Sequence, residues 1–184
     1  AGGLWEDAGK MQRAEAAYRN AYAAVPQDEA PLEALANLLL AEGRWEDAAR
    51  VWRDAAEYSS GSLAIGRWRR AAVLASTRLS DAELAARCFG RLLPLDPGDP
   101  QALAFLAERA RAAGQWPKAR ELLERLADSL ADASQEERAS LAMRRAEACE
   151  RGGDLPAADE RWKLASSLDP AAREPWKAQK RIAL

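Results

Sequence analysis

Apolar residues recur along the chain at intervals of three and four, and no stretch shows the sustained alternation that marks a β-strand. Ala48, Trp52 and Ala55 lie at i, i+4 and i+7, so they share one face of a helix. The segment 32–39 repeats this pattern just upstream. Alanine, leucine, arginine and glutamate, all good helix formers, dominate the sequence. The pattern predicts an all-α protein made of short amphipathic helices.

A six-residue signature that starts with glycine and ends with alanine recurs along the chain. Its copies occupy residues 9–14, 43–48, 80–85, 114–119 and 153–158, and Ser80 replaces the glycine in the third copy. Two of the four intervals between copies are 34 residues long, and the other two are 37 and 39. Four residues after each final alanine stands a large apolar residue: Tyr18, Trp52, Phe89, Leu123 or Trp162. The chain is therefore predicted to repeat one structural unit.

Residues typical of helix ends separate the predicted helices. Asp99 followed by Pro100 is typical of an N-cap and a first turn. Ser80 and Ser134 each stand three residues before a glutamate, which is the spacing of a capping box. The signature glycines fall where one helix ends and the next begins. Each unit is thus expected to be an antiparallel pair of helices joined by a tight turn.

The period, the signature and the small–large–small spacing resemble the tetratricopeptide repeat. The resemblance implies a right-handed α-solenoid of antiparallel helix pairs, with about four full repeats and a partial repeat at each end. The extra residues of the two longer intervals are predicted to lie between pairs, near 61–65 and 132–138. A single array is expected, made of a partial unit at 1–28, full units at 29–62, 66–99, 100–133 and 139–172, and a last helix at 173–184.

The small and large positions of the unit have distinct packing roles. Ala48, Ala85, Ala119 and Ala158 are small because the two helices of a pair are expected to approach closely there. The large residues, such as Trp52 and Trp162, are expected to fill the space between one pair and the next. Neither role is catalytic.

The resemblance further implies a concave face, lined by the first helix of each pair, that binds an extended peptide or a helix of a partner. Helical spacing places a provisional set of side chains on this face. The set comprises Glu33, Asn37, Arg67, Arg70, Phe105, Glu108, Arg111, Met143, Arg144 and Glu147.

The cluster Arg67-Trp68-Arg69-Arg70 permits two interpretations. It is either a solvated basic face with Trp68 packed inward, or a site for an acidic peptide. In the second case the guanidinium groups of Arg67, Arg70 and Arg111 would contact carboxylates of the partner.

One class of this repeat family clamps a C-terminal carboxylate with basic and asparagine side chains on successive first helices. Asn37 stands where that class has an asparagine, but Glu33, one turn earlier, replaces the expected lysine. An acidic side chain there would repel the ligand's carboxylate, so we expect this clamp to be absent.

Composition and charge narrow the function further. The chain has 184 residues, 27 basic and 29 acidic side chains, no histidine and two cysteines. A net charge of −2 does not favour general binding to nucleic acid or anionic membranes. The lack of histidine removes histidine-based acid–base chemistry and most metal sites. We expect no enzyme activity and no cofactor, and we expect Cys88 and Cys149 to be buried, reduced thiols.

The favoured function is a protein–protein interaction scaffold. Self-association through incomplete end units is an alternative, since each end is expected to expose an apolar helix face. Binding of single-stranded RNA is a further alternative, disfavoured by the acidic residues on the predicted inner face. The excess of arginine over lysine, together with abundant alanine, is typical of a bacterial protein from a GC-rich genome. The chain starts within a predicted unit, so we expect it to be part of a longer protein, and we expect a cytoplasmic location.

Overall fold

A computed structural model describes the backbone of residues 2–182 and the side chains of residues 9–182. The described residues form ten α-helices and no strand, which confirms the all-α prediction. The helices are α1 (Gly2–Ala24), α2 (Glu29–Ala41), α3 (Trp45–Glu57), α4 (Gly61–Thr77), α5 (Ala82–Leu92), α6 (Pro100–Ala112), α7 (Trp116–Ser129), α8 (Gln135–Arg151), α9 (Leu155–Leu168) and α10 (Arg173–Ile182). They divide into two compact units that meet between Leu95 and Asp96. None of the described helices has the length and apolar character needed to cross a membrane.

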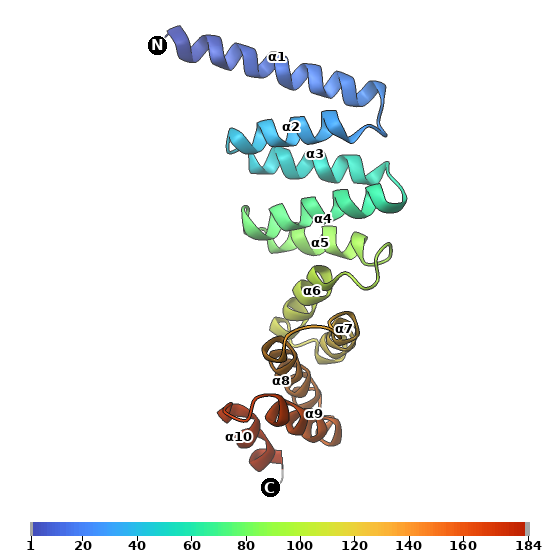
Figure 1. The fold of residues 1–184 in the computed structure, drawn as a ribbon, viewed down its shortest axis with the longest axis vertical. Helices are drawn as coiled ribbons and strands as arrows, with labels where there is room; N and C mark the ends of the chain where they lie inside the picture. Colours follow the sequence, from blue (N-terminus) through green and yellow to red (C-terminus); the bar gives the residue numbers. More distant parts are fainter. Residues whose placement is uncertain (1, 183–184) are drawn as a thin grey trace. The chain divides into compact units, whose positions relative to one another are not determined.

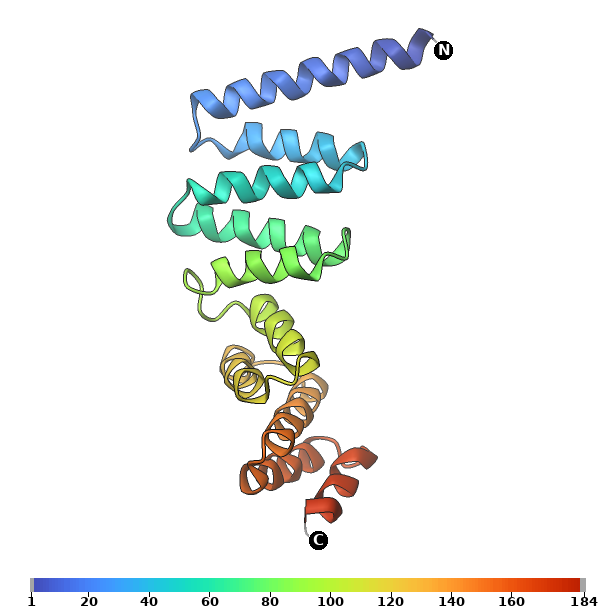
Figure 2. The ribbon, with the colours of Figure 1, turned by 180° about the vertical axis from the view of Figure 1, so that it is seen from behind.

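The first unit contains α1 to α5, and each helix packs on the next along the chain. Figures 1 and 2 show α2 to α5 lying side by side with alternating direction. The buried side chains between α2 and α3 are those that the three- and four-residue spacing predicts. They include Leu32, Leu35, Leu39, Ala48 and Trp52.

The second unit contains α6 to α10 and follows the same rule, with each helix packed on its successor. One continuous core of this unit joins α8, α9 and α10. Ala142, Ala146, Cys149, Ala158 and Trp162 form this core with Ala178. Cys149 and Cys88 are both buried, free thiols, as the sequence predicts.

The small and large positions of the signature take their predicted places. The four signature alanines, Ala48, Ala85, Ala119 and Ala158, are all 0% exposed. Trp52, Phe89, Leu123 and Trp162 are buried, and Tyr18 is half-buried against the α2–α3 core. Because the alanine sites leave no free surface, a larger side chain there would force the helices of a pair apart.

The signature glycines end the first helix of each pair in a left-handed conformation. Gly43, Gly114 and Gly153 have φ values of 71°, 68° and 83°. Ser80, which replaces the glycine in the third copy, has φ 51° and therefore holds a conformation that favours glycine. The turn is thus kept even where its glycine is missing. The turn predicted at Gly9 is wrong, because Gly9 lies within the continuous helix α1.

The predicted caps are confirmed at two of three sites. The Asp99 carboxylate accepts a hydrogen bond from the Ala102 amide, and Ser134 forms a reciprocal capping box with the glutamate three residues later. The capping box predicted at Ser80 is wrong, because the neighbouring Asp81 caps α5 by accepting from the Leu84 amide.

The prediction that the extra residues lie between pairs is wrong for 61–65, which belong to α4, and right only in part for 132–138, where 132–134 precede α8. α4 begins at Gly61 and α8 at Gln135, and each is 17 residues long, whereas α2 and α6 have 13. Four added residues make about one helical turn. Most of the inserted residues therefore lengthen the first helix of these two pairs.

Candidate functional site

A groove in the first unit lies between the first helices α2 and α4. It has a volume of about 480 Å3 and is called here the α2–α4 groove. It is lined by Glu33, Asn37, Leu40, Trp52, Arg69, Arg70, Val73 and Leu74. Trp52 comes from α3, the helix between the two, and the aliphatic side chains are partly exposed. The groove therefore combines an apolar lining with a charged rim.

Arg70 connects the two sides of this groove. Its guanidinium lies over the Trp52 ring, 4.6 Å from the ring centre. Its Nη2 donates to Glu33 Oε1 at 2.8 Å, and its Nη1 lies 3.7 Å from Glu29 Oε1. The side chain is 42% exposed, so it can be reached from solvent although it is already paired.

A second groove has the same place in the repeat, between α8 and α10. The α8–α10 groove has a volume of about 600 Å3 and is lined by Met143, Arg144, Glu147, Glu150, Arg151, Trp162, Glu174 and Arg181. Trp162 occupies the repeat position of Trp52, and its Nε1 donates to Glu150 Oε2 at 3.0 Å. Arg181 donates to both oxygens of Glu150 and so lowers the pKa of that carboxyl. This groove is more strongly charged than the α2–α4 groove.

A third groove separates α6 from α8. The α6–α8 groove has a volume of about 430 Å3 and is lined by Pro100, Gln101, Ala104, Leu126, Leu130, Glu136, Glu137, Ser140 and Arg144. Leu126 and Leu130 reach it from α7 and its C-terminal cap, as Trp52 reaches the first groove from α3. Arg144 lines both the α6–α8 groove and the α8–α10 groove.

Several residues predicted for the inner face do line these grooves. Asn37 and Arg70 line the α2–α4 groove, and Arg144 and Glu147 line the α8–α10 groove. Met143, the remaining predicted residue of α8, also lines the α8–α10 groove.

Glu108 and Arg111 of α6 form an ionic link with α8. Arg111 donates to Glu108 at 2.6 Å and also to Glu147, which bridges the two first helices. The Arg111 side chain is only 18% exposed, and both of its neighbouring carboxylates belong to this chain. Phe105 is half-buried on the same helix.

Arg67 is the exception to the predicted set, because the structure buries it. Its side chain is 2% exposed and donates to Tyr22 Oη, Ser59 Oγ and the backbone oxygens of Pro26 and Ala55. Its Nε lies 3.5 Å from Glu29 Oε1. This corrects the prediction that Arg67 faces a partner. The adjacent Trp68 is buried, as the first interpretation of the cluster expected. The same interpretation placed Arg67 in solvent, and that part is wrong.

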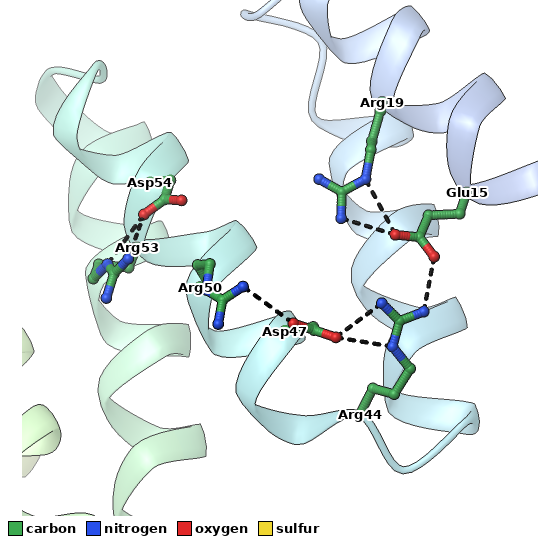
Figure 3. Close-up of polar contacts among 7 residues, drawn as sticks. All are labelled: Glu15, Arg19, Arg44, Asp47, Arg50, Arg53 and Asp54. Carbon is green, nitrogen blue, oxygen red and sulfur yellow. Dashed lines mark hydrogen bonds and ion pairs between the residues drawn. The ribbon is translucent and has the colours of Figure 1, made fainter. Parts of the chain in front are cut away.

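An ionic network that the sequence analysis did not predict joins α1 to the α2–α3 turn. Figure 3 shows Glu15 between Arg19 and Arg44, with Arg44 continuing to Asp47. Hydrogen bonds from Arg44 and then Arg19 lower the pKa of Glu15. The bonds that Arg44 donates to Glu15, Asp47 and Glu42 raise the pKa of Arg44 above its usual value. Since Glu15 and Arg44 are 29 residues apart, only the folded chain brings them together.

Trp52 and Trp162 were predicted only as fillers between helix pairs. The structure gives each a second role, as the aromatic wall of a groove. The sequence signal for this role is the large residue four positions after the signature alanine, which recurs in every copy.

Comparison with known proteins identifies the fold. No protein-family model matches the chain, and neither does any curated protein. Among solved structures, YrrB, described as a TPR protein with an unusual peptide-binding site, is 14% identical with a TM-score of 0.57, covering 97% of this chain and 88% of that one. MamA from Desulfovibrio magneticus RS-1 is 18% identical with a TM-score of 0.56, covering 92% of this chain and 89% of that one. PilF from Pseudomonas aeruginosa is 18% identical with a TM-score of 0.55, covering 89% of this chain and 71% of that one. The chain therefore has the tetratricopeptide-repeat fold.

Proposed function

We propose that this chain of tetratricopeptide-repeat fold is a protein–protein interaction scaffold, whose first helices hold an extended segment of a protein partner. The observation that carries the proposal is the recurrence of one groove in both units. Trp52 and Trp162 hold the same repeat position, and each lines a groove between two first helices. A repeated groove with an aromatic wall and a polar rim suits a peptide, which presents side chains at regular intervals.

The solved structures offer a parallel. YrrB has the same fold and is described as having an unusual peptide-binding site. That description applies to YrrB. We extend peptide binding to the present chain because of its own grooves.

The charges at the grooves favour a peptide over single-stranded RNA. Arg70 and Arg181, which line grooves, are each paired with glutamates of this chain, and so is Arg111 on the first helix α6. RNA binding depends on cations that are free to neutralise phosphates. An arginine that is already paired with a glutamate contributes little to binding a polyanion, but it can still hydrogen-bond to a peptide and orient it.

Selection from a phage-displayed library of random dodecapeptides tests the proposal. Peptides should enrich on the wild-type chain. Each peptide should lose affinity when a tryptophan fills the groove that holds it, through Asn37→Trp in the α2–α4 groove or Ser140→Trp in the α6–α8 groove. Glu46→Trp, which adds the same side chain at an exposed position of α3, is the matched control and should leave binding unchanged. The proposal fails if no peptide enriches, or if neither groove variant weakens binding more than Glu46→Trp does.

Self-association is a second candidate function, and exposed apolar side chains near both ends favour it. Trp176 on α10 is 54% exposed and Met11 on α1 is 42% exposed. Large exposed apolar groups favour association. Sedimentation velocity over a concentration series should then show a dimer that Trp176→Glu dissociates. A monomer at all concentrations would exclude this candidate.

A further inference from the structure

Arg144 differs from the other arginines of the chain whose Nε is buried without a hydrogen bond. Among the described residues, five arginines, Arg144 included, have a buried Nε without a hydrogen bond: Arg67, Arg111, Arg144, Arg145 and Arg161. Four of them use their Nη atoms in hydrogen bonds or ion pairs with acceptors of this chain. For Arg144 the described part of the chain supplies neither.

The surroundings of Arg144 make this lack of a partner costly. Burial, more than any neighbouring charge, lowers the pKa of its guanidinium. Of the charges that act on it, Glu108 favours the cation and Arg111 opposes it, and Arg111 already occupies Glu108 with a hydrogen bond. A partly desolvated cation of this kind is stabilised by an anion that arrives from outside.

We propose that Arg144 binds the carboxylate of an aspartate or glutamate side chain within the partner's peptide segment. The inference rests on the proposed function, because it names the chemistry that one of its grooves would recognise. A guanidinium presents paired N–H donors in the geometry of a carboxylate, so an acidic side chain fits better than a neutral one.

The position of Arg144 indicates a side chain rather than the end of a peptide. Arg144 lines both the α6–α8 groove and the α8–α10 groove, so a segment that places a carboxylate there has room to continue on both sides. A C-terminal carboxylate would leave one of these grooves empty.

The walls of the α6–α8 groove specify the neighbour of the acidic residue. Ala104, Leu126 and Leu130 offer apolar surface next to Arg144. Glu136 and Glu137 line the same groove, and Glu137 is engaged in the capping box of α8. An apolar residue beside the acid would fill this groove, whereas a second acid would meet those two glutamates.

The same dodecapeptide library provides the test. Peptides enriched on the wild-type chain should carry an aspartate or glutamate next to apolar residues, and Arg144→Met should lose that preference. In a double-mutant cycle, replacing the peptide's glutamate by glutamine or Arg144 by methionine should each weaken binding roughly tenfold to a hundredfold. The two changes together should weaken it no further than either alone.

Matched variants identify the cause of any loss. Arg138→Met removes an exposed arginine from the same helix and should leave binding unchanged. Arg144→Lys keeps the charge but not the paired donors, so it should restore only part of the affinity. Circular dichroism should show that all three variants keep the helical content of the wild type.

The outcomes separate the two proposals. Enriched peptides without an acidic residue, or acidic peptides that bind Arg144→Met as tightly as the wild type, would overturn the role of Arg144 and leave the scaffold function standing. A preference for free C-termini that C-terminal amidation abolishes would also overturn it. Enrichment of no peptide would overturn both.

Discussion

Replacing Arg67 by methionine should destabilise the first unit, although Arg67 lines none of the three grooves. Methionine keeps an unbranched apolar stem of similar length and removes the charge and every donor. Arg67 is 2% exposed and joins α4 to Tyr22 of α1, to Pro26 in the α1–α2 loop and to Ser59 after α3. The substitution therefore cuts a cross-link between segments that are far apart in the sequence.

The magnitude follows from the groups that lose this partner. The Pro26 carbonyl and the Ser59 hydroxyl each lose a charged donor, worth about 1 kcal/mol apiece once partial access of water is allowed. The guanidinium also lies 5.5 Å from the ring centre of Tyr22, a contact worth about 0.5–1 kcal/mol. The Ala55 carbonyl keeps the Ser59 hydroxyl as a donor, and Glu29, 31% exposed, regains water. The expected loss in the free energy of unfolding is about 2–3 kcal/mol.

Urea unfolding followed by circular dichroism measures this loss, and hydrogen exchange localises it. Arg70→Met is the matched control, three residues further along α4. Arg70 is 42% exposed and its ion pairs face solvent, so its loss should cost less than about 1 kcal/mol. Faster exchange in Arg67→Met should be confined to the first unit. Equal stabilities of the two variants would refute the view that Arg67 is an internal cross-link.

Three further predictions follow from the turns, the paired carboxylates and the thiols. Ser80→Gly should raise the free energy of unfolding by about 0.5–1 kcal/mol by relieving a positive φ, and Gly114→Ser should lower it similarly; equal urea midpoints would contradict this. The pKa of Glu150 is lowered, so its carboxylate stabilises the fold above its usual pKa of 4.5, and this stabilisation is lost as the pH falls through the folded value. Glu150→Gln should therefore be less stable than wild type at pH 7 and equally stable in acid. A constant difference in the free energy of unfolding across that pH range would contradict this. Burial raises the pKa of both thiols, Cys88 and Cys149, so Ellman's reagent should react with them only after unfolding in urea; fast reaction of the native chain would show that they are accessible.

The parts of the fold that were predictable are those that depend on local spacing. The alanines and large residues of the signature recur at fixed intervals, and the close approach of helices requires these sizes. The N-cap at Asp99 is likewise encoded within four residues. The start of α4 was missed because Gly61 is typical of a break between helices. In the structure it has φ 58° and is the first residue of the helix.

The candidate site was less predictable, because the state of an arginine depends on distant partners. Arg67, Arg111 and Arg144 are all charged residues on first helices, and helical spacing alone placed them together on one face. Arg67 is buried because the α1–α2 loop brings Pro26 to it from 41 positions away. Arg111 is neutralised by Glu147, 36 positions away, whereas no comparable acceptor reaches Arg144 within the described residues. Such pairings arise only when the helices pack.

The most direct test of the scaffold account is to map where a selected peptide binds. The chain labelled with 15N would be titrated with a library-selected peptide while its amide chemical shifts are recorded. The account predicts that the largest shift changes fall on the first helices, among the groove-lining residues of α2 and α4 or of α6, α8 and α10. Largest changes on the solvent-facing residues of the second helices α3, α5, α7 and α9 would contradict it.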